Sequence, residues 1–581
     1  MLCRVLSAIL VALWLWTTEV SAALEGVVAT ATHGMVIAGE TAPQWLRNNL
    51  AGYEDAFTLN LAGESLRACP ALSYFYRDRD FHLAWQDEQG PLPHADGLIR
   101  ALQAAHQEGL DPADYYLPRI ESLLGQVRHH WRAGTVTPAM AGELDALLSQ
   151  AFLRYAAHLS GRRLDPSSVD PEWFAKRPPV DLLSVLVAAV TSEAVERTLQ
   201  DLRPHHPGYG RLREALAHYR GIATKGGWPL IPPGPKLELH QHSNRVGLLR
   251  ARLAAEGYLP NSPSSLFDEP VRQAVRTFQQ THGQEPTGVV GDATLDALNV
   301  PVAARIKQIT INMERWRWLP HNLGRRHIMV NVAGYDMEVV ENDHAVMAMK
   351  VVVGKPYLRT PVFSAELSYL VLSPYWNVPP TIAGKEILPA IRKDPNYLAK
   401  HDMEAVLRKP GAQGGNPAAI DWSQPGAEAL AYRFRQRPGP KNPLGTVKFM
   451  LPNPFDVYLH DTSQRNLFSR TERVFSHGCI RIEKPMDLLE YVLGHNPRYD
   501  RKAVEEIIAA KRERIIGVPD PIPVHILYWT TWVSEDGKVH FRKDVYGRDK
   551  LLETALENPA AVGPGNGAGE TPPLSSPARS G

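Results

Sequence analysis

The first of three patterns of apolar and polar residues along the chain has the period of a helix. Between about residues 40 and 230, apolar residues recur at intervals of three and four positions, as in Leu98, Leu102 and Ala105. This interval places side chains on one face of a helix, and Gly109 follows where such a helix would end. The pattern predicts a mainly helical scaffold domain over residues 40–230, in which no grouping of catalytic residue types occurs.

A shorter helical pattern follows over residues 237–300. Asp268 precedes its second apolar run and is a predicted N-cap, with Pro270 in the first turn. Asp292 is predicted to cap a third, shorter helix after a turn at Gly288. The first two helical faces consist of Val246, Leu249 and Leu253, and of Val271, Val275 and Phe278. We therefore expect a small unit of three helices.

From about residue 325 the period changes to two. Ile328 and Val330 alternate with Met329 and Asn331, which is the pattern of a strand. Further β-rich runs cover residues 336–340, 346–353 and 367–372. We predict a mostly antiparallel β-domain over residues 325–505, followed by a C-terminal segment over residues 506–557. The expected fold class is multi-domain α+β.

Two regions depart from these patterns. The segment over about residues 376–445 is rich in Pro and Gly, with helical stretches near residues 382–391. A long insertion of this kind in a compact domain is usually either functional or disordered, and we predict a cap over a cleft. Residues 558–581 consist largely of Pro, Gly, Ser and Ala, a composition that predicts a disordered tail.

The length and net charge of the chain bear on the number of domains and on the class of partner. The chain has 581 residues, enough for three or four domains at roughly 150 residues each. Its 63 Lys and Arg balance 62 Asp and Glu, which gives a formal charge of +1. This balance gives no reason to expect a nucleic-acid partner.

The N-terminus has the layout of a secretory signal peptide. Arg4 is followed by an apolar run over residues 5–16, and Val20-Ser21-Ala22 forms a small-residue cleavage site. The run is short for a membrane span. We predict a signal peptide over residues 1–22 and a periplasmic protein, and the alternative is an uncleaved segment that anchors the chain.

The three cysteines are Cys3, Cys69 and Cys479. Cys3 lies in the predicted signal peptide, and the other two are too few for a disulfide framework in a protein of this size. A bridge between Cys69 and Cys479 is arithmetically possible. The residues around Cys479 instead indicate a reactive thiol.

A histidine pair accompanies Cys479. His460 ends a strand-like run, and His477 lies two residues before the cysteine. A cysteine attacks acyl groups as the thiolate, which requires a neighbouring base or cation. Histidine suits this role because its ordinary pKa is close to neutral pH. We predict Cys479 as nucleophile and His460 as its base, while His477 supports the site or only shapes the turn.

Other candidate residues surround this pair. Gly478 allows backbone conformations that direct its amide and that of Cys479 at one oxyanion. Arg481 is a candidate to hold a substrate carboxylate, to support the thiolate or to form a structural ion pair. Ser476 is expected to bond within the turn. Tyr458 shares a strand face with His460 and is a candidate substrate contact, as is Trp376 at the start of the cap.

These residues resemble the L,D-transpeptidase family. His460, a gap of fifteen residues, and Ser476-His477-Gly478-Cys479-Ile480-Arg481 are similar to its ordered motif. Residues 373–380 and 314–318 are similar to segments of its large multi-domain branch. The three-helix unit resembles a peptidoglycan-binding domain. Asp461 departs from the family, where many members have Gly or Ser at this position. The resemblance implies that the third member of the catalytic triad, beside His460 and Cys479, is the backbone carbonyl of Asp461, so its side chain should matter little.

The resemblance implies a reaction on peptidoglycan stem peptides. Cys479 would attack the third residue of a tetrapeptide stem and release D-Ala, with His460 as acid. An amine of a second stem would then resolve the thioester, with His460 as base, to give a 3→3 cross-link in cell-wall biogenesis. No cofactor is expected. Other cell-wall synthesis proteins are expected partners, and the protein is expected to be a monomer.

Alternatives share parts of this chemistry. Water or a free D-amino acid as acceptor would make the protein an L,D-carboxypeptidase or exchange enzyme, and a terminal lysine would make it attach a lipoprotein to the wall. A non-catalytic wall-binding scaffold would not need the Cys-His arrangement. His460, His477 and Cys479 could also supply three zinc ligands, although no His-Glu-x-x-His or paired Cys-x-x-Cys motif occurs.

Overall fold

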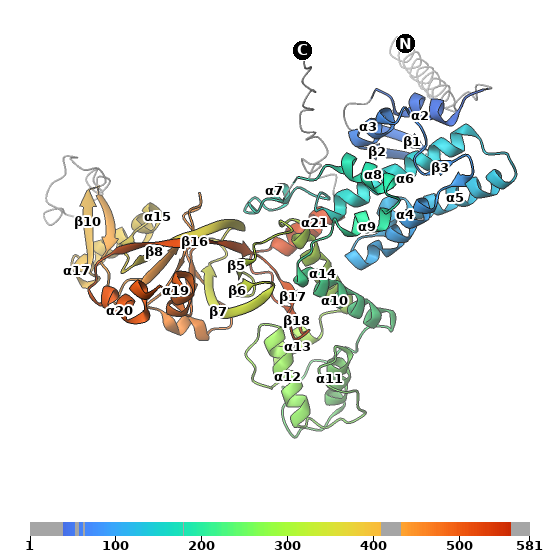
Figure 1. Cartoon of the computed structure of the whole chain (residues 1–581). Helices are drawn as coiled ribbons and strands as arrows, with labels where there is room; N and C mark the ends of the chain where they lie inside the picture. The colour runs from blue at the N-terminus through green and yellow to red at the C-terminus, as the bar shows by residue number, and fades with distance from the viewer. Residues whose placement is uncertain are drawn as a thin grey trace, which may run out of the picture. The chain divides into compact units, whose positions relative to one another are not determined.

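The computed structural model describes residues 39–52, 57–61, 64–177, 179–407, 432–494 and 496–558 (Figure 1). The chain forms two compact units, the first up to residue 96 with residues 118–151, and the second comprising residues 97–117 and those from 152 onward. The predicted signal peptide and nearly all of the predicted tail lie outside the described residues. No helix in the described ranges is both long and apolar enough to span a membrane.

The first unit is built mainly from α2 (Ala42–Leu50), α3 (Pro70–Asp78) and the greater parts of α5 (Leu117–Arg132) and α6 (Pro138–Leu159). Its core contains a buried carboxylate, Asp145, which accepts hydrogen bonds from Tyr76 Oη and from the backbone N–H of Ala84 and Trp85. Such bonds satisfy a charge that would otherwise be costly to bury. The unit also contains two short hairpins, β1 (Phe57–Leu61) with β2 (Glu64–Ala68) and β3 (Gln86–Asp87) with β4 (Gly90–Pro91), which the helical pattern did not predict.

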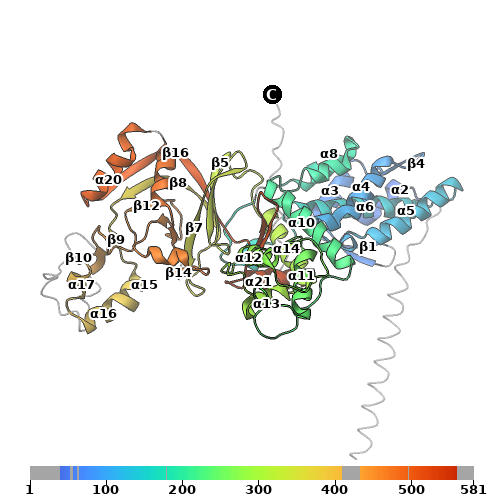
Figure 2. The same cartoon turned by 90° about the horizontal axis from the view of Figure 1, so that it is seen from below.

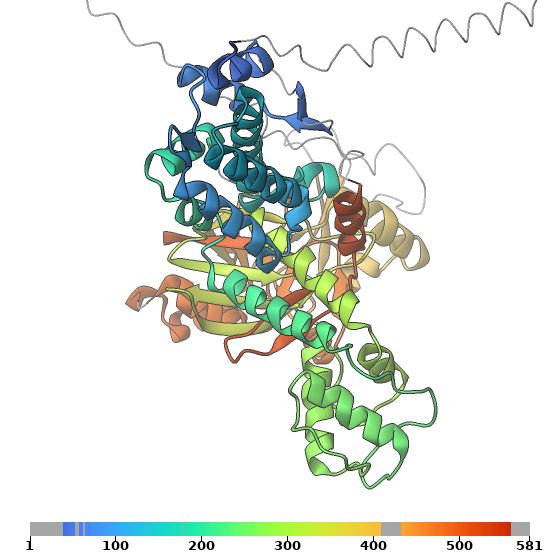
Figure 3. The same ribbon diagram turned by 90° about the vertical axis from the view of Figure 1, so that its right-hand side faces the viewer.

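The predicted three-helix unit consists of α11 (Asn244–Ala255), α12 (Glu269–Thr281) and α13 (Asp292–Leu298) around its own apolar core, and Figure 3 shows these helices grouped together. Asp268 accepts a hydrogen bond from the N–H of Val271, so the predicted N-cap of α12 is confirmed. The prediction for α13 was wrong by one position. Gly291 occupies the N-cap, and Asp292 lies in the first turn, where a carboxylate is favoured by the helix dipole.

A mixed sheet of nine strands forms the centre of the second unit, in the order β14-β7-β15-β13-β12-β8-β16-β5-β6, and β6 also pairs with β7. Most neighbours are antiparallel, as predicted, but β13 with β15, β14 with β7, and β16 with β5 are parallel. The strand bounds are β5 (Arg326–Asn331), β6 (Asp336–Glu341), β7 (His344–Gly354), β8 (Phe363–Leu372), β12 (Val447–Met450), β13 (Leu459–His460), β14 (Val474–Ser476), β15 (Ile480–Ile482) and β16 (Arg514–Leu527).

The predicted end of the β-domain at residue 505 was wrong, because β16 is a central strand of this sheet. It pairs with β8 on one side and β5 on the other. Pro519, Pro521 and Pro523 interrupt its apolar pattern, and its register shifts between Gly517 and Ile522. Proline disfavours an ordinary central strand, which explains why the sequence pattern did not reveal it. After β16 come β17 (Thr531–Val533), β18 (Val539–Phe541) and α21 (Arg548–Glu557).

Helices pack outside this sheet. They are α10 (Pro207–Thr224), α14 (Val302–Arg317), α19 (Pro485–Leu493) and α20 (Arg501–Ala509). Trp316 of α14 stacks on Trp529, with ring centroids 4.3 Å apart, which attaches this helix to the segment after β16. Aromatic pairs in this geometry add to the free energy gained from apolar burial.

The predicted cap insertion lies between β8 and β12. Its strands β9 (Trp376–Asn377), β10 (Met403–Leu407) and β11 (Tyr432–Gln436) form a separate sheet. Figure 2 shows them gathered with α15 (Pro380–Ile382), α16 (Leu388–Lys393) and α17 (Tyr397–Lys400) at one end of the molecule's large sheet. Buried apolar residues give the insertion a core of its own: Val378, Ile382, Ile387, Ile391, Met403 and Phe434. Residues 408–431 of the insertion lie outside the described residues.

Candidate active site

Two parallel strands bring the predicted nucleophile and base to one face of the sheet. In the pairing of β13 with β15, Leu459 lies opposite Ile480 and His460 opposite Arg481. Leu459 and Ile480 are fully buried in the core. Side chains alternate between the faces of a strand, so His460 and Arg481 project from the other face. Tyr458 and Cys479 precede them by two positions and share that face.

A lysine that the sequence analysis missed belongs to the same face. Lys448 on β12 lies opposite His460 on the other side of β13. Its Nζ lies 4.1 Å from the centroid of the Tyr458 ring, a cation–π contact. Its neighbours Val447 and Phe449 are fully buried. A lysine between two apolar strand residues was therefore the signal that could have identified it.

His460 is held by a backbone carbonyl. Its Nδ1 lies 2.5 Å from the carbonyl oxygen of Asp461. A carbonyl can only accept a hydrogen bond, so Nδ1 carries the proton and Nε2 keeps its lone pair. The side chain is 4% exposed, and burial, helped by the nearby Arg481 guanidinium, lowers the pKa of His460 to about 3. The imidazole is thus neutral at ordinary pH and able to accept a proton at Nε2.

Cys479 is half-buried beside Tyr458. Its Sγ lies 3.6 Å from the carbonyl oxygen of Asp456. Burial raises the pKa of the thiol, while its bonds with Tyr458 and the charges of Lys448 and Arg481 oppose that rise. Burial also raises the pKa of Tyr458. The resting site therefore pairs a neutral thiol with a neutral imidazole, so a thiolate must form by proton transfer during attack.

The loop before Cys479 is tightly bonded. Ser476 Oγ donates to the carbonyl of Cys479 at 2.5 Å and accepts from the N–H of Gly478 at 3.1 Å. Thr360 Oγ1 donates to the carbonyl of Gly478 at 2.8 Å. Gly478 has a φ of +116°, a conformation that other residues avoid. The Gly478 amide is thus engaged with Ser476, and its predicted part in an oxyanion hole would require this bond to be exchanged.

His477 is bonded to the cap insertion. Its Nε2 lies 2.8 Å from Oε1 of Glu386, which belongs to η3 (Ala383–Ile387), a π-helical turn. Turns of this kind are rare, occur mostly as single turns within α-helices and are frequent at functional sites. The carboxylate can only accept, so Nε2 of His477 carries a proton. Within the described ranges, no cluster of three or more His, Cys, Asp or Glu side chains is arranged to hold a metal ion.

Arg481 is only partly satisfied by the protein. Its Nη1 donates to Gln464 Oε1 at 2.6 Å, but its buried Nε has no hydrogen-bond partner among the described residues. Burial lowers the pKa of Arg481, and Cys479 opposes this. A buried donor without a partner is costly, so Arg481 is suited to receive an oxygen from a ligand.

Asp461 has a structural role that the sequence did not indicate. Its Oδ2 accepts from the N–H and Oγ1 of Thr446, both at 2.9 Å, and its Oδ1 lies 3.1 Å from Arg465 Nη1. These bonds hold the peptide whose carbonyl binds His460.

Trp376 lies within the cap. It is partly buried against the core of the insertion and pairs with Gln436 of β11. The predicted contact of Trp376 with substrate stays a prediction. The strands of the large sheet bring together a different set of residues: Tyr458, His460, Cys479, Arg481 and Lys448.

Comparison with known families agrees with this geometry. Residues 325–522 match the model of the L,D-transpeptidase catalytic domain, residues 242–298 match a model described as "Putative peptidoglycan binding domain", and residues 70–216 match that of a scaffold domain. These matches confirm the resemblance predicted from the sequence. Three separate parts of the chain are thus similar to a scaffold domain, a putative peptidoglycan-binding domain and an L,D-transpeptidase catalytic domain.

Individual relatives are more distant. A protein of Haemophilus influenzae described as "Putative L,D-transpeptidase" is 32% identical over 254 residues, which cover 43% of this chain and 50% of that relative. The chain thus spans about half the length of the curated relative that it matches. An L,D-transpeptidase structure from Xylanimonas cellulosilytica is 14% identical, covering 51% of this chain and 100% of its own, with a TM-score of 0.16. The structure of an Ldtfm-avibactam carbamoyl enzyme is 12% identical, covering 54% of this chain and 98% of its own, also with a TM-score of 0.16.

Proposed function

We propose that this protein is a periplasmic L,D-transpeptidase that forms 3→3 cross-links in peptidoglycan through a thioester on Cys479. The observation that carries the proposal is the position of His460. Its Nδ1–H is fixed on the Asp461 carbonyl, and its Nε2 is free to take a proton on the strand face that also presents Cys479. A backbone carbonyl thus does the orienting work that a carboxylate does in other triads.

The first half-reaction begins when His460 Nε2 takes the proton from the Cys479 thiol. The thiolate sulfur attacks the carbonyl carbon of the third residue of a tetrapeptide stem. The tetrahedral intermediate collapses, the C–N bond to D-Ala breaks, and the His460 imidazolium returns the proton to the leaving amine. A thioester remains, and the acyl group keeps the energy needed for a second transfer.

The second half-reaction uses the same histidine as base. The side-chain amine of another stem attacks the thioester, His460 takes one of its protons, and the sulfur leaves as the thiolate, which is reprotonated. The product is an amide between two third residues. Lys448 and Arg481 support this chemistry because their charges oppose the rise in the pKa of Cys479, and the unpartnered Nε of Arg481 suits a substrate carboxylate.

Product masses test the proposal. The mature protein is incubated with purified disaccharide-tetrapeptide beside its Cys479→Ala variant. A cross-linked dimer that has lost one D-Ala, made only by the wild type, supports the transpeptidase. Tripeptide alone would identify an L,D-carboxypeptidase, and incorporation of an added D-amino acid would identify an exchange enzyme. Equal product from the Cys479→Ala variant would reject the thioester mechanism.

A further inference from the structure

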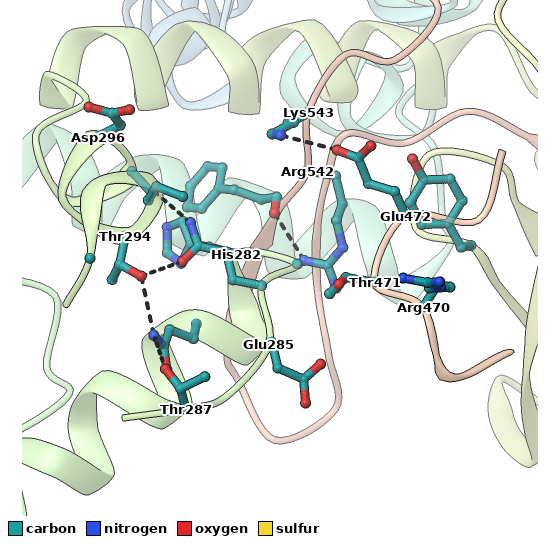
Figure 4. Close-up of a pocket in the computed structure, with 18 of the residues that line it drawn as sticks. His282, Glu285, Thr287, Thr294, Asp296, Arg470, Thr471, Glu472, Arg542 and Lys543 are labelled. Carbon is teal, nitrogen blue, oxygen red and sulfur yellow. Dashed lines mark hydrogen bonds and ion pairs between the residues drawn. The ribbon is translucent and has the colours of Figure 1, made fainter. Parts of the chain in front are cut away.

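A groove of about 1290 Å³ lies between the peptidoglycan-binding domain and the catalytic domain (Figure 4). One wall is formed by residues 279–297, at the end of α12 and around α13. The other is formed by residues 467–475 and 541–543. Phe475 in this second wall directly precedes Ser476, the first residue of the loop that carries Cys479 (residues 476–480, the nucleophile loop). The groove therefore adjoins, along the chain, the segment that positions Cys479.

The two walls are held together by direct bonds. Arg542 Nη1 donates to the carbonyl of Thr281 at 2.7 Å. The ring of His282 stacks on Phe278, with centroids 3.7 Å apart, and lies 5.4 Å from Phe541 of the opposite wall. These contacts join the last turn of α12 to the end of β18. Both walls of the groove therefore belong to the second unit and are fixed to each other by these contacts.

The loop that shapes the first wall is also preorganised. Gln279 Nε2 donates to the carbonyl of Val289 at 2.9 Å, and its Oε1 accepts from the N–H of Gly288 at 2.8 Å. Thr294 Oγ1 donates to Gln284 Oε1 at 2.7 Å. A surface fixed in this way loses little conformational entropy when it binds a ligand.

The two walls carry charges of opposite sign, and most of these charged side chains form no ion pair with a described residue. Glu285, Asp292 and Asp296 are exposed on the first wall, and none forms an ion pair with a described residue. Arg470 on the second wall is likewise exposed and forms no ion pair in the described part of the chain. Lys543 is already paired with Glu472 at 3.0 Å. Figure 4 shows Glu285 and Asp296 on one side of the groove and Arg470 on the other.

We propose that this groove binds the acceptor stem peptide of a second peptidoglycan strand, an inference that rests on the proposed function. An acceptor must carry a free amine, and a stem peptide also carries carboxylates. The ammonium group suits the carboxylates of Glu285, Asp292 and Asp296, and a stem carboxylate suits Arg470. The peptidoglycan-binding domain thereby holds the acceptor strand against the catalytic domain.

Binding to the full chain tests this inference without turnover. The probe is a disaccharide-tripeptide with a free side-chain amine, which lacks the D-Ala that a donor must release. Its Kd is measured by calorimetry on the Cys479→Ala protein. We expect Glu285→Gln with Asp296→Asn, and separately Arg470→Gln, to raise the Kd roughly three- to tenfold, because each removes a charge contact at a solvated surface. Matched controls are Glu505→Gln and Arg512→Gln, exposed residues outside the groove, and they should leave the Kd unchanged.

The ligand provides an independent control. A tripeptide acetylated on the side-chain amine should bind the unsubstituted groove as weakly as the native tripeptide binds the Glu285→Gln, Asp296→Asn protein. An unchanged Kd in the groove variants, or equal binding of the disaccharide without a peptide, would overturn the inference. Release of D-Ala from disaccharide-tetrapeptide by the wild-type enzyme reports on the proposed function separately. Release together with unchanged groove binding would reject the acceptor site alone.

Discussion

The imidazole of His460 donates from Nδ1 to the carbonyl oxygen of the next residue, Asp461, across 2.5 Å. The orienting group is therefore part of the backbone, and no side-chain substitution can delete it. The carboxylate of Asp461 is occupied elsewhere, with Thr446 and Arg465. Because the carbonyl and the carboxylate of Asp461 have separate roles, substitutions at positions 460 and 461 should lower activity by very different amounts.

We expect His460→Ala to lower kcat about 10²- to 10⁴-fold, the usual contribution of a general acid–base group. Asp461→Asn should lower it by less than about tenfold, because an amide oxygen still accepts from Thr446 and the carbonyl remains. Release of D-Ala from disaccharide-tetrapeptide measures both. Equal losses in the two variants would mean that the Asp461 carboxylate takes part in the chemistry directly.

Lys448 should control the reactivity of Cys479. Its positive charge lowers the pKa of the thiol against the effect of burial. In Lys448→Met that pKa should rise further, so alkylation by iodoacetamide should require a higher pH than in the wild type. Lys448→Arg keeps the charge and serves as the control.

Alkylation of each cysteine is followed by peptide mass spectrometry, because Cys69 is also a free thiol whose pKa is raised by burial. A pH profile for Cys479 that is the same in Lys448→Met and wild type would show that the lysine does not act on the sulfur.

The sequence alone identified most residues of the site, but it did not predict the hydrogen bonds that these residues form. His460 and Cys479 were identified from residue type and order, and the two-residue period of a strand placed Tyr458 beside His460. Lys448 was missed because its strand, β12, comes directly after the cap insertion and pairs with β13 only in the folded sheet. The engagement of the Gly478 amide by Ser476 depends on one loop conformation, which residue types alone do not determine.

In the fold, likewise, elements set by local signals could be predicted, and elements set by long-range pairing could not. The three helices around residues 237–300 were predictable because caps and apolar faces are local signals. The place of β16 in the centre of the sheet was not, because it is set by pairing with β8 and β5, and its prolines conceal the strand pattern. Parallel pairing of β13 with β15 is likewise a property of the whole sheet.

Glu386 should hold the cap insertion closed over the nucleophile loop. Its bond to His477 joins η3 of the cap to the residue two positions before Cys479. Glu386→Ala removes a partly exposed hydrogen bond, so we expect KM for disaccharide-tetrapeptide to rise roughly two- to fivefold with little change in kcat. Lys385→Ala, an exposed neighbour on the same turn, is the matched control.

Hydrogen exchange gives this prediction a readout apart from turnover. Amides of the loop over residues 476–480 should exchange faster in Glu386→Ala than in Lys385→Ala, because the cap opens more often. Identical exchange and identical KM in the two variants would show that the bond between Glu386 and His477 does not restrain the cap.

His525 should make the second unit less stable as the pH falls. Its side chain is 5% exposed, with Nε2 donating to the carbonyl of Leu323 and Nδ1 bonded to Ser364 Oγ, both at 2.8 Å. Burial lowers its pKa to about 4, below the ordinary value near 6.5. Between these values the unfolded chain binds a proton that the folded protein does not. The stabilisation is therefore complete above about pH 6.5 and decreases as the pH falls toward 4, by about 1.4 kcal/mol per pH unit.

The variant His525→Gln cannot titrate and should respond less to acid. It should be less stable than the wild type at pH 7.5, because it loses packing, but the difference should shrink by about 2 kcal/mol at pH 5. Urea unfolding at the two pH values, followed by tryptophan fluorescence, measures this change. His344→Gln, at a side chain 79% exposed, should lose as much stability between the two pH values as the wild type. If His525→Gln also loses as much, then His525 binds its proton over the same pH range in the folded and unfolded protein, and burial does not lower its pKa.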